Sequence, residues 1–246
     1  MTIYIGTSGF SYDDWVGKFY PETLQRNEWL GYYSTYFNTI ELNVTFYRMP
    51  QKNIFSSWYK KTGKGFLFSV KGSRYITHIK RLHDTKDAID YFFSGVNLLK
   101  EKLGVILWQF PPSLSPDIKV FSNFLKHISK YNKSVHAFEF RSALWLRDDI
   151  INLIKDAGAT VCISDWNGVE MPYIPGFNFY YIRRHGPKKA PLYSGSYTKR
   201  EIIADARMIQ SKMKGMDVFV YYNNDVRAHA IANAFELKKK LAKNSK

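Results

Sequence analysis

The sequence contains one cysteine, Cys162, in 246 residues. A single cysteine excludes an internal disulfide and any metal cluster built from several cysteines. Because Cys162 lies in the apolar run 160–163, we expect it to be a small buried hydrophobic residue. No stretch approaches about eighteen uninterrupted apolar residues, so the sequence predicts no transmembrane helix. It also lacks a basic start followed by an apolar segment, and we therefore expect a cytoplasmic protein.

Short motifs typical of cofactor and metal sites are absent too. The sequence contains neither the GxGxxG pattern of dinucleotide-binding proteins nor the GxxxxGK[ST] pattern of phosphate-binding loops. It has no HExxH zinc motif, and of its 6 histidines only His78 and His185 fall near the ends of predicted strands. The spacing gives no reason to expect a metal or a cofactor.

Acidic residues are in short supply, with 21 Asp and Glu against 36 Lys and Arg, for a net charge of +15. Such an excess favours an anionic partner, either nucleic acid or a phosphorylated small molecule, and no membrane partner is expected. The alternative is that many lysines, such as those in 238–246, are simply solvated at the end of a helix. Nothing in the sequence indicates an oligomeric state.

The chain does contain eight short apolar runs rich in β-forming residues, most of them followed by a helical pattern. Alternating strands and helices are typical of a parallel sheet closed by crossovers. The sequence predicts an α/β fold, a single (β/α)8 TIM-type barrel. The predicted strands are 3–9, 39–46, 66–72, 105–110, 135–141, 160–165, 179–185 and 217–222. The predicted helices are 24–36, 51–61, 85–102, 116–129, 148–157, 199–214 and 226–243.

The connection after strand six differs from the others. Residues 166–178 include Gly168, Pro172, Pro175 and Gly176, so we expect an irregular connection in place of a regular helix. A chain of 246 residues lies within the usual range for such a barrel, and we expect one domain over 1–246.

Each predicted strand closes on polar or ionisable side chains, and in such barrels the carboxyl ends of the strands carry the functional groups. We expect four acids and bases as catalytic candidates: His185, Glu139, Glu41 and Asp165. We expect the following residues to bind a ligand: Thr7, Ser8, Asn43, Thr45, Lys71, His78, Gln109, Arg141, Trp145, Arg183, Asn223 and Asn224.

The roles follow from the chemistry of these groups. His185 ends a strand, precedes Gly186, and titrates near neutral pH, so it is the leading acid or base, with Glu139 next. The cations Lys71, Arg141 and Arg183 are expected to hold an anion. The polar groups Glu41, Asn43, Asn223 and Gln109 would orient it. An alternative for Glu139 and Arg141 is a buried structural ion pair.

Strand two and the segment after strand three carry further signals. In 39–46 the polar residues Glu41, Asn43 and Thr45 alternate with apolar ones, which predicts one polar strand face directed into the barrel mouth. The segment 71–81 is the densest basic cluster outside the tail and suits a phosphate backbone. Aromatic rings nearby, including Trp145, would stack on bases or sugars, or pack under loops.

Several motifs resemble one family. They are residues 5–9 (IGTSG) with Tyr12 and Trp15, 19–21, 37–43, 45–47, Thr77-His78, Leu103-Gly104, 109–112, 139–141 with Trp145, 181–186 and 222–225. In this order, over nearly the whole chain, they are similar to the YecE-like family, also called domain of unknown function 72. The resemblance implies a TIM-type barrel of unsettled role and, through kinship with endonuclease-IV-like barrels, a phosphate or DNA ligand.

The chain departs from these patterns at three points. It lacks the many metal-binding histidines of the endonucleases, it has Phe10 where the family often has Trp, and it has Ser142 where many members have His. We therefore expect binding of a phosphate-bearing ligand, a nucleic acid or nucleotide, by a hydrolase or phosphodiesterase. The alternatives are a metal-assisted sugar isomerase or hydrolase, and a nucleic-acid-binding module without catalysis.

Overall fold

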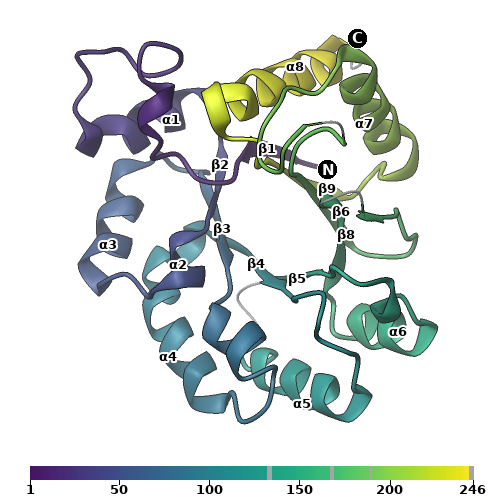
Figure 1. The fold of residues 1–246 in the computed structure, drawn as a ribbon. Helices are drawn as coiled ribbons and strands as arrows, with labels where there is room; N and C mark the ends of the chain where they lie inside the picture. The colour runs from purple at the N-terminus through teal and green to yellow at the C-terminus, as the bar shows by residue number, and fades with distance from the viewer. Residues whose placement is uncertain (132–134, 167–168, 189, 244–246) are drawn as a thin grey trace. The chain divides into compact units, whose positions relative to one another are not determined.

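The computed structural model describes residues 1–131, 135–166, 169–188 and 190–243 (Figure 1). Eight parallel strands lie in the order β1-β9-β8-β6-β5-β4-β3-β2, and the short β7 pairs with β6. The predicted (β/α)8 TIM-type fold is confirmed. The strands are β1 Ile3–Thr7, β2 Thr39–Leu42, β3 Leu67–Lys71, β4 Leu103–Gln109, β5 Val135–Glu139, β6 Thr160–Trp166, β7 Val169–Met171, β8 Phe179–Arg184 and β9 Asp217–Tyr222.

The helices alternate with the strands, as the apolar periodicity predicts. They are α1 Trp29–Tyr36, α2 Val44–Tyr47, α3 Lys52–Lys61, α4 Lys86–Val96, α5 Ile118–Ile128, α6 Asp148–Asp156, α7 Lys199–Lys212 and α8 His229–Lys243. Short turns of 3-10 or π helix are η1 Asp13–Trp15, η2 Arg26–Glu28, η3 Tyr75–Ile79, η4 Asn97–Lys102, η5 Ala143–Trp145 and η6 Val226–Ala228. No helix within the described ranges is long and apolar enough to cross a membrane.

The chain divides into two compact units. Unit 1 consists of Met1–Glu41, Ile163–Pro175 and Phe179–Lys246, and unit 2 of Leu42–Cys162 and Gly176–Asn178. The single domain expected over 1–246 stays a prediction. Candidate site residues occur in both units.

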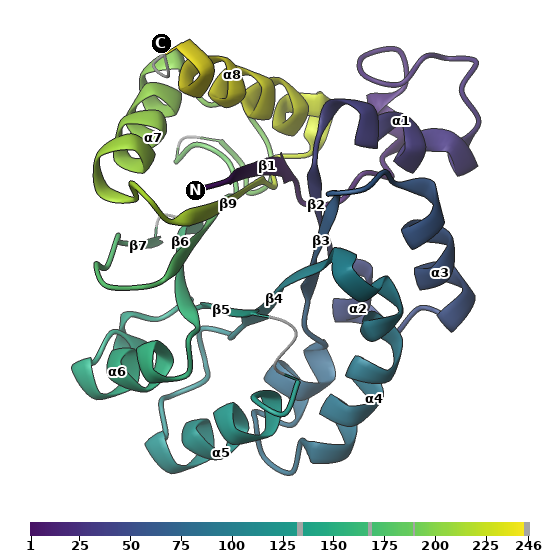
Figure 2. The same ribbon diagram turned by 180° about the vertical axis from the view of Figure 1, so that it is seen from behind.

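In unit 1, β9 lies between β1 and β8, and all three run parallel. Both views show α7 and α8 side by side (Figures 1 and 2). Helix α8 buries Ala230, Ala234 and Leu237, which share one helical face because they are spaced by four and three residues. The small alanines allow close packing of the helix, and the face is apolar, so this burial stabilises unit 1.

In unit 2, β4 pairs in parallel with β3 and β5, and all seven of its residues are buried. The helix α5 begins where the Asp117 side chain accepts a hydrogen bond from the Val120 backbone, and it buries Phe121, Phe124 and Ile128 along one face. The Trp108 ring meets Phe124 edge-on with 5.1 Å between centroids. Large rings therefore fill the space between strand and helix.

The prediction for strand two is wrong beyond Leu42. The predicted strand 39–46 ends there, Asn43 has α-helical backbone angles, and Val44–Tyr47 form the helical turn α2. In this turn the Thr45 hydroxyl donates a hydrogen bond to the Lys71 carbonyl, with an oxygen–oxygen distance of 2.6 Å. Such a side-chain bond to the backbone competes with the hydrogen bonds of a strand. Glu41, Asn43 and Thr45 consequently do not form one polar strand face.

Other element boundaries differ by a few residues from the predicted ones, and two of them concern candidate site residues. Strands β5 and β8 end at Glu139 and Arg184, so Arg141 and His185 lie beyond them. The segment after β3, for which no helix was predicted, contains the π-helical turn η3. The irregular connection after β6 is confirmed, and its described part includes β7, which pairs antiparallel with β6. Gly168, one of the residues on which this prediction rests, lies outside the described residues.

Candidate functional site

Unit 1 contains a buried ion pair between Glu41, at the end of β2, and Arg183 in β8. The Arg183 Nη2 atom lies 2.8 Å and its Nε atom 3.2 Å from Glu41 Oε1. The two side chains are 1% and 0% exposed. The Tyr181 hydroxyl donates to Glu41 Oε2 at 2.6 Å, and the Ser8 hydroxyl bonds to Oε1. The carboxylate is thus surrounded by donors, as a buried charge requires.

His185 continues this network. Its Nε2 atom lies 3.0 Å from Arg183 Nη1, and since a guanidinium only donates hydrogen bonds, Nε2 accepts. The ring proton of the neutral imidazole is then on Nδ1, which faces Asp165 Oδ1 at 3.5 Å. The side chain is 0% exposed. These two contacts fix the tautomer of His185 and place its ring between Arg183 and Asp165.

Asp165, near the end of β6, holds the segment that follows β8. Its Oδ1 accepts from the His185 backbone at 2.7 Å and its Oδ2 from the Tyr197 hydroxyl at 2.6 Å. Burial raises the pKa of the Asp165 carboxyl, but the hydrogen bond from His185 and the charge of Arg184 outweigh it, and the pKa lies below its ordinary value. Asp165 is therefore an ionised anchor for this loop.

Asp225, three residues after β9, differs from the other carboxyl groups of unit 1. The Tyr12 hydroxyl lies 2.6 Å from the Ser8 carbonyl oxygen and 3.0 Å from Asp225 Oδ2. The phenolic proton is thus shared between two acceptors, the Ser8 carbonyl and the Asp225 carboxyl. Burial raises the pKa of Asp225 well above its ordinary value and Glu41 adds to the effect, while the Tyr12 hydrogen bond and Arg183 oppose it. Asp225 therefore holds its proton to higher pH than an exposed carboxyl group.

Unit 2 carries a second polar cluster, at the carboxyl ends of β3, β4 and β5. Glu139 ends β5 in register with Gln109, which ends β4. The Arg141 Nε atom lies 3.6 Å from Glu139 Oε1, with side chains 10% and 0% exposed. Lys71 ends β3, and its Nζ atom lies 4.1 Å from the centroid of the Phe46 ring. We call Lys71, His78, Gln109, Glu139 and Arg141 the cationic cluster.

His78 is the half-buried imidazole of this cluster. It lies in η3, where the Thr77 hydroxyl is 2.8 Å from its Nδ1 atom, and its Nε2 faces Gln109 Nε2 at 3.5 Å. Burial lowers the pKa of His78 to about 4, and Lys71, Arg74 and Arg141 contribute to the shift. Glu139 opposes them. His78 is therefore neutral at pH 7, first because it is half-buried and second because cations outnumber carboxylates around it.

The remaining expected ligand residues lie among backbone partners. The Thr7 hydroxyl donates to the Gly9 carbonyl, and Trp145 is buried with its ring nitrogen donating to the Leu114 carbonyl at 2.7 Å. The Asn224 amide donates to the Gly195 carbonyl and to Asn233 Oδ1. Asn223 is buried after β9, and Asn43 is partly exposed. These contacts order loops, and a ligand role for the residues stays a prediction.

Sequence reasoning missed several members of the unit 1 network: Tyr12, Tyr181, Tyr197, Asp205 and Asp225. Tyr12, Tyr181 and Asp225 stand within the motifs that carry the family resemblance, which was their one signal. Asp205 lies in α7 and pairs with Arg184, its Oδ2 accepting from Nε at 2.9 Å. Nothing in the local sequence around Asp205 or Tyr197 predicts these partners.

The arrangement of the His, Cys, Asp and Glu side chains shows whether they could bind a metal ion. Within residues 1–131, 135–166, 169–188 and 190–243, no group of three or more His, Cys, Asp or Glu side chains is arranged to hold a metal ion. The carboxylates of the unit 1 network instead contact Arg, Tyr and Ser donors.

Comparison with known proteins identifies the family. The model of the family "Protein of unknown function DUF72" matches residues 4–246. The chain belongs to the DUF72 family. It is 24% identical to the UPF0759 protein YunF of Bacillus subtilis, over 96% of this chain and 93% of YunF. It is 27% identical to the UPF0759 protein YecE of Escherichia coli K12, over 46% of this chain and 39% of YecE.

Solved DUF72 structures share the fold. A DUF72 family protein from Thermotoga maritima superposes with a TM-score of 0.85 at 29% identity, covering 98% of this chain and 100% of that one. A DUF72 family protein from Enterococcus faecalis gives a TM-score of 0.82 at 20% identity, over 98% and 96% of the two chains. The resemblance to the YecE-like family is thereby confirmed.

Proposed function

We propose that this DUF72 protein binds a phosphate-bearing ligand, a nucleotide or nucleic acid, through the cationic cluster at the carboxyl ends of β3, β4 and β5. Lys71 and Arg141 would neutralise the phosphate charge, and the Gln109 amide and His78 would hydrogen-bond its oxygens. The proposal needs residues of unit 2 alone.

The observation that carries the proposal is the grouping of Lys71, Gln109 and Arg141 at or just beyond the carboxyl ends of the neighbouring strands β3, β4 and β5. The half-buried His78 lies beside them, and burial is the largest cause that lowers its pKa to about 4. The excess of three cations, Lys71, Arg74 and Arg141, over the carboxylate Glu139 adds to the shift. Such an excess is costly in the free protein and is relieved when an anion binds.

The surroundings of the cluster suit a ligand that carries an aromatic base. Phe46 meets His78 and Tyr47 edge-on, with centroid distances of 5.1 Å in both cases. Tyr47 is 79% exposed, so its ring is available for stacking. Base-to-aromatic stacking contributes roughly 1–3 kcal/mol per base. A nucleoside monophosphate is therefore expected to bind more tightly than inorganic phosphate.

Titration calorimetry with inorganic phosphate and a nucleoside monophosphate tests the proposal. Arg141→Gln removes a charge-assisted hydrogen bond and is expected to weaken both ligands about tenfold. The matched control is Arg147→Gln, because Arg147 is exposed and pairs with Asp149 outside the cluster. Equal losses in the two variants, or no saturable binding by the unaltered protein, would contradict the proposal.

Phosphodiester hydrolysis is a second candidate, favoured by the neutral, half-buried imidazole of His78 beside these cations. A neutral imidazole accepts a proton from an attacking water, and adjacent cations stabilise charge on the phosphoryl oxygens. An assay with a chromogenic phosphodiester should show activity that His78→Gln lowers at least about a hundredfold. Binding without turnover would leave the ligand proposal standing and reject this one.

A further inference from the structure

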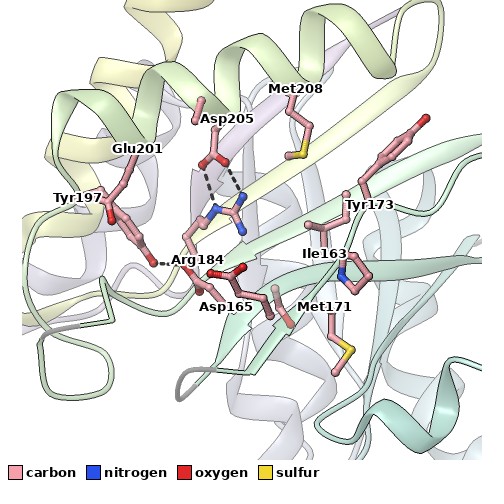
Figure 3. Close-up of a pocket in the computed structure, with 13 residues that line it drawn as sticks. Ile163, Asp165, Met171, Tyr173, Arg184, Tyr197, Glu201, Asp205 and Met208 are labelled. Atoms are coloured by element: carbon pink, nitrogen blue, oxygen red, sulfur yellow. Dashed lines mark hydrogen bonds and ion pairs between the residues drawn. The ribbon is translucent and has the colours of Figure 1, made fainter.

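Unit 1 contains a cavity of about 470 Å³ between helix α7 and the β6–β7 pair of strands (Figure 3). None of the residues that line it belongs to the cationic cluster. Small-molecule sites commonly have volumes of roughly 300–1,000 Å³. The cavity is therefore large enough for a small organic ligand.

The irregular connection between β6 and β8 explains why the space is unfilled. Residues 169–178 contain the short strand β7 and no helix, so the helix that normally covers a crossover in this fold is missing here. The side of α7 that carries Asp205 and Met208 consequently faces the β6–β7 strands across the cavity (Figure 3).

The walls combine adaptable apolar side chains with carboxylates. Ile163, Met171, Tyr173 and Met208 line the cavity. Methionine side chains adjust to the shape of a ligand and pack well against it. The charged lining residues are the carboxylates Asp165, Glu170, Glu201 and Asp205 and one cation, Arg184.

The charges of these residues do not cancel. Arg184 pairs with Asp205 through two nitrogen atoms, so this pair contributes no net charge. Glu170 has a partner, Lys188, at 2.9 Å, but their side chains are 62% and 63% exposed and solvent weakens such a pair. Asp165 accepts hydrogen bonds from the His185 backbone and the Tyr197 hydroxyl and shares the charge of Arg184 with Asp205. Four carboxylates thus face one guanidinium among the lining residues. In a protein with a net charge of +15, this cavity is negative.

We propose that the cavity binds an organic cation, an alkyl or aryl amine whose ammonium group meets the Asp165 and Glu170 carboxylates while its apolar body packs on Met171, Met208 and Tyr173. An anion is disfavoured by the carboxylates, and a neutral ligand gains the apolar contacts alone. This site is separate from the cationic cluster and does not depend on the proposed function.

Binding of benzylamine to the full chain, followed by nuclear magnetic resonance, tests the proposal, with benzyl alcohol and benzoate as neutral and anionic analogues. Benzylamine should bind saturably and shift the signals of α7 and the β6–β7 strands. Benzyl alcohol should bind at least about threefold more weakly, and benzoate should not bind. Equal binding of the three compounds, or no saturable shift with benzylamine, would overturn the proposal.

Two variants locate the site. Glu170→Gln should weaken benzylamine about threefold without affecting benzyl alcohol, because it removes one partly exposed charge. Ala204→Leu on the exposed face of α7 extends a side chain into the cavity and should weaken both compounds. The matched control is Glu236→Gln on α8, where Glu236 pairs with Lys240 away from the cavity. Unchanged affinity in both cavity variants would place the amine elsewhere and contradict the proposal.

Discussion

The two polar clusters use similar residues and differ in how their charges are balanced. In unit 1 the Glu41 carboxylate meets Arg183, Tyr181 and Ser8 in a fully buried network. In unit 2 the cations Lys71, Arg74 and Arg141 act on a half-buried His78, with Glu139 as the one carboxylate that opposes them. In the first arrangement the buried charges are paired within the protein, whereas in the second the cations outnumber the carboxylate, which is why we propose it as the anion site.

His185 in unit 1 and His78 in unit 2 differ in the same way as the two clusters. His185 is 0% exposed, and its Nε2 accepts from Arg183, so it orients a guanidinium. His78 is half-buried and neutral within a field of cations. His185 directly follows β8 and His78 lies in η3, and the two imidazoles differ in exposure and in the charged groups around them.

The largest expected effect concerns the buried pair of unit 1. Arg183→Gln leaves Glu41 buried without its cation and should lower the free energy of unfolding by about 3–5 kcal/mol. Arg141→Gln in unit 2 should cost less, about 1–3 kcal/mol, because the Arg141 Nε atom lies 3.6 Å from Glu139 Oε1, a longer contact than the 2.8 Å of the Arg183–Glu41 pair. Urea unfolding of both variants, with the exposed Arg147→Gln as reference, measures the loss of unfolding free energy in each. A larger loss for Arg141→Gln than for Arg183→Gln would contradict the difference drawn between the two clusters.

The variant Tyr181→Phe in unit 1 should lower the unfolding free energy without changing phosphate affinity. Tyr181→Phe removes the hydroxyl that donates to Glu41 at 2.6 Å and should cost about 1.5–3 kcal/mol of unfolding free energy, the usual value for a bond to a charged group. Phosphate affinity should stay within about twofold, since the cationic cluster is untouched. Calorimetry on the folded variant checks this, and a tenfold loss of affinity would assign the ligand to unit 1.

Asp225→Asn tests the raised pKa of Asp225 in unit 1. The folded state holds the Asp225 proton to higher pH than the unfolded state, so this group's contribution to stability is complete below pH 3.8 and declines as pH rises toward its folded-state pKa. The amide does not titrate, and its oxygen still accepts the hydrogen bond from Tyr12. The unfolding free energy of the variant relative to the unaltered protein should therefore increase from pH 5 to pH 9. The exposed Asp13→Asn serves as control, and a difference that is constant with pH would show that Asp225 is ionised.

The smallest expected effect concerns His78. Its folded-state pKa lies below its ordinary value, so its contribution to stability is complete above pH 6.5 and is lost as pH falls toward about 4. His78→Gln should lose less stability than the unaltered protein between pH 6.5 and pH 4.5. Burial also lowers the pKa of His136 in unit 2 to about 4, so His136→Gln gives the second reference for acid unfolding. Identical pH dependence of the unfolding free energy in His78→Gln and in the unaltered protein would contradict the lowered pKa of His78.

Local patterns predicted most of the fold. The buried strand β4 and the apolar face of α5 follow from continuous and helical hydrophobic patterns that depend on neighbouring residues alone. Strand β2 was predicted too long because Thr45 bonds to the Lys71 carbonyl, 26 residues away. No local pattern contains such a partner.

The candidate site was predictable in its position and less so in its organisation. Strand ends placed Glu41, Arg183 and His185 near one another, but their hydrogen-bond roles depend on distances that spacing does not give. Asp205 was missed because an acidic residue on a helix usually faces solvent, whereas here it meets Arg184, 21 residues earlier. The low pKa of His78 arises from burial and from cations on separate segments, so it could be found only in three dimensions.

The most direct test of the anion-binding account is the titration of the His78 ring by nuclear magnetic resonance, with and without inorganic phosphate. In the free protein the pKa should be about 4, and phosphate should raise it, because a bound anion favours the charged imidazolium. A pKa near the ordinary value of 6.5 that phosphate leaves unchanged would contradict the central claim.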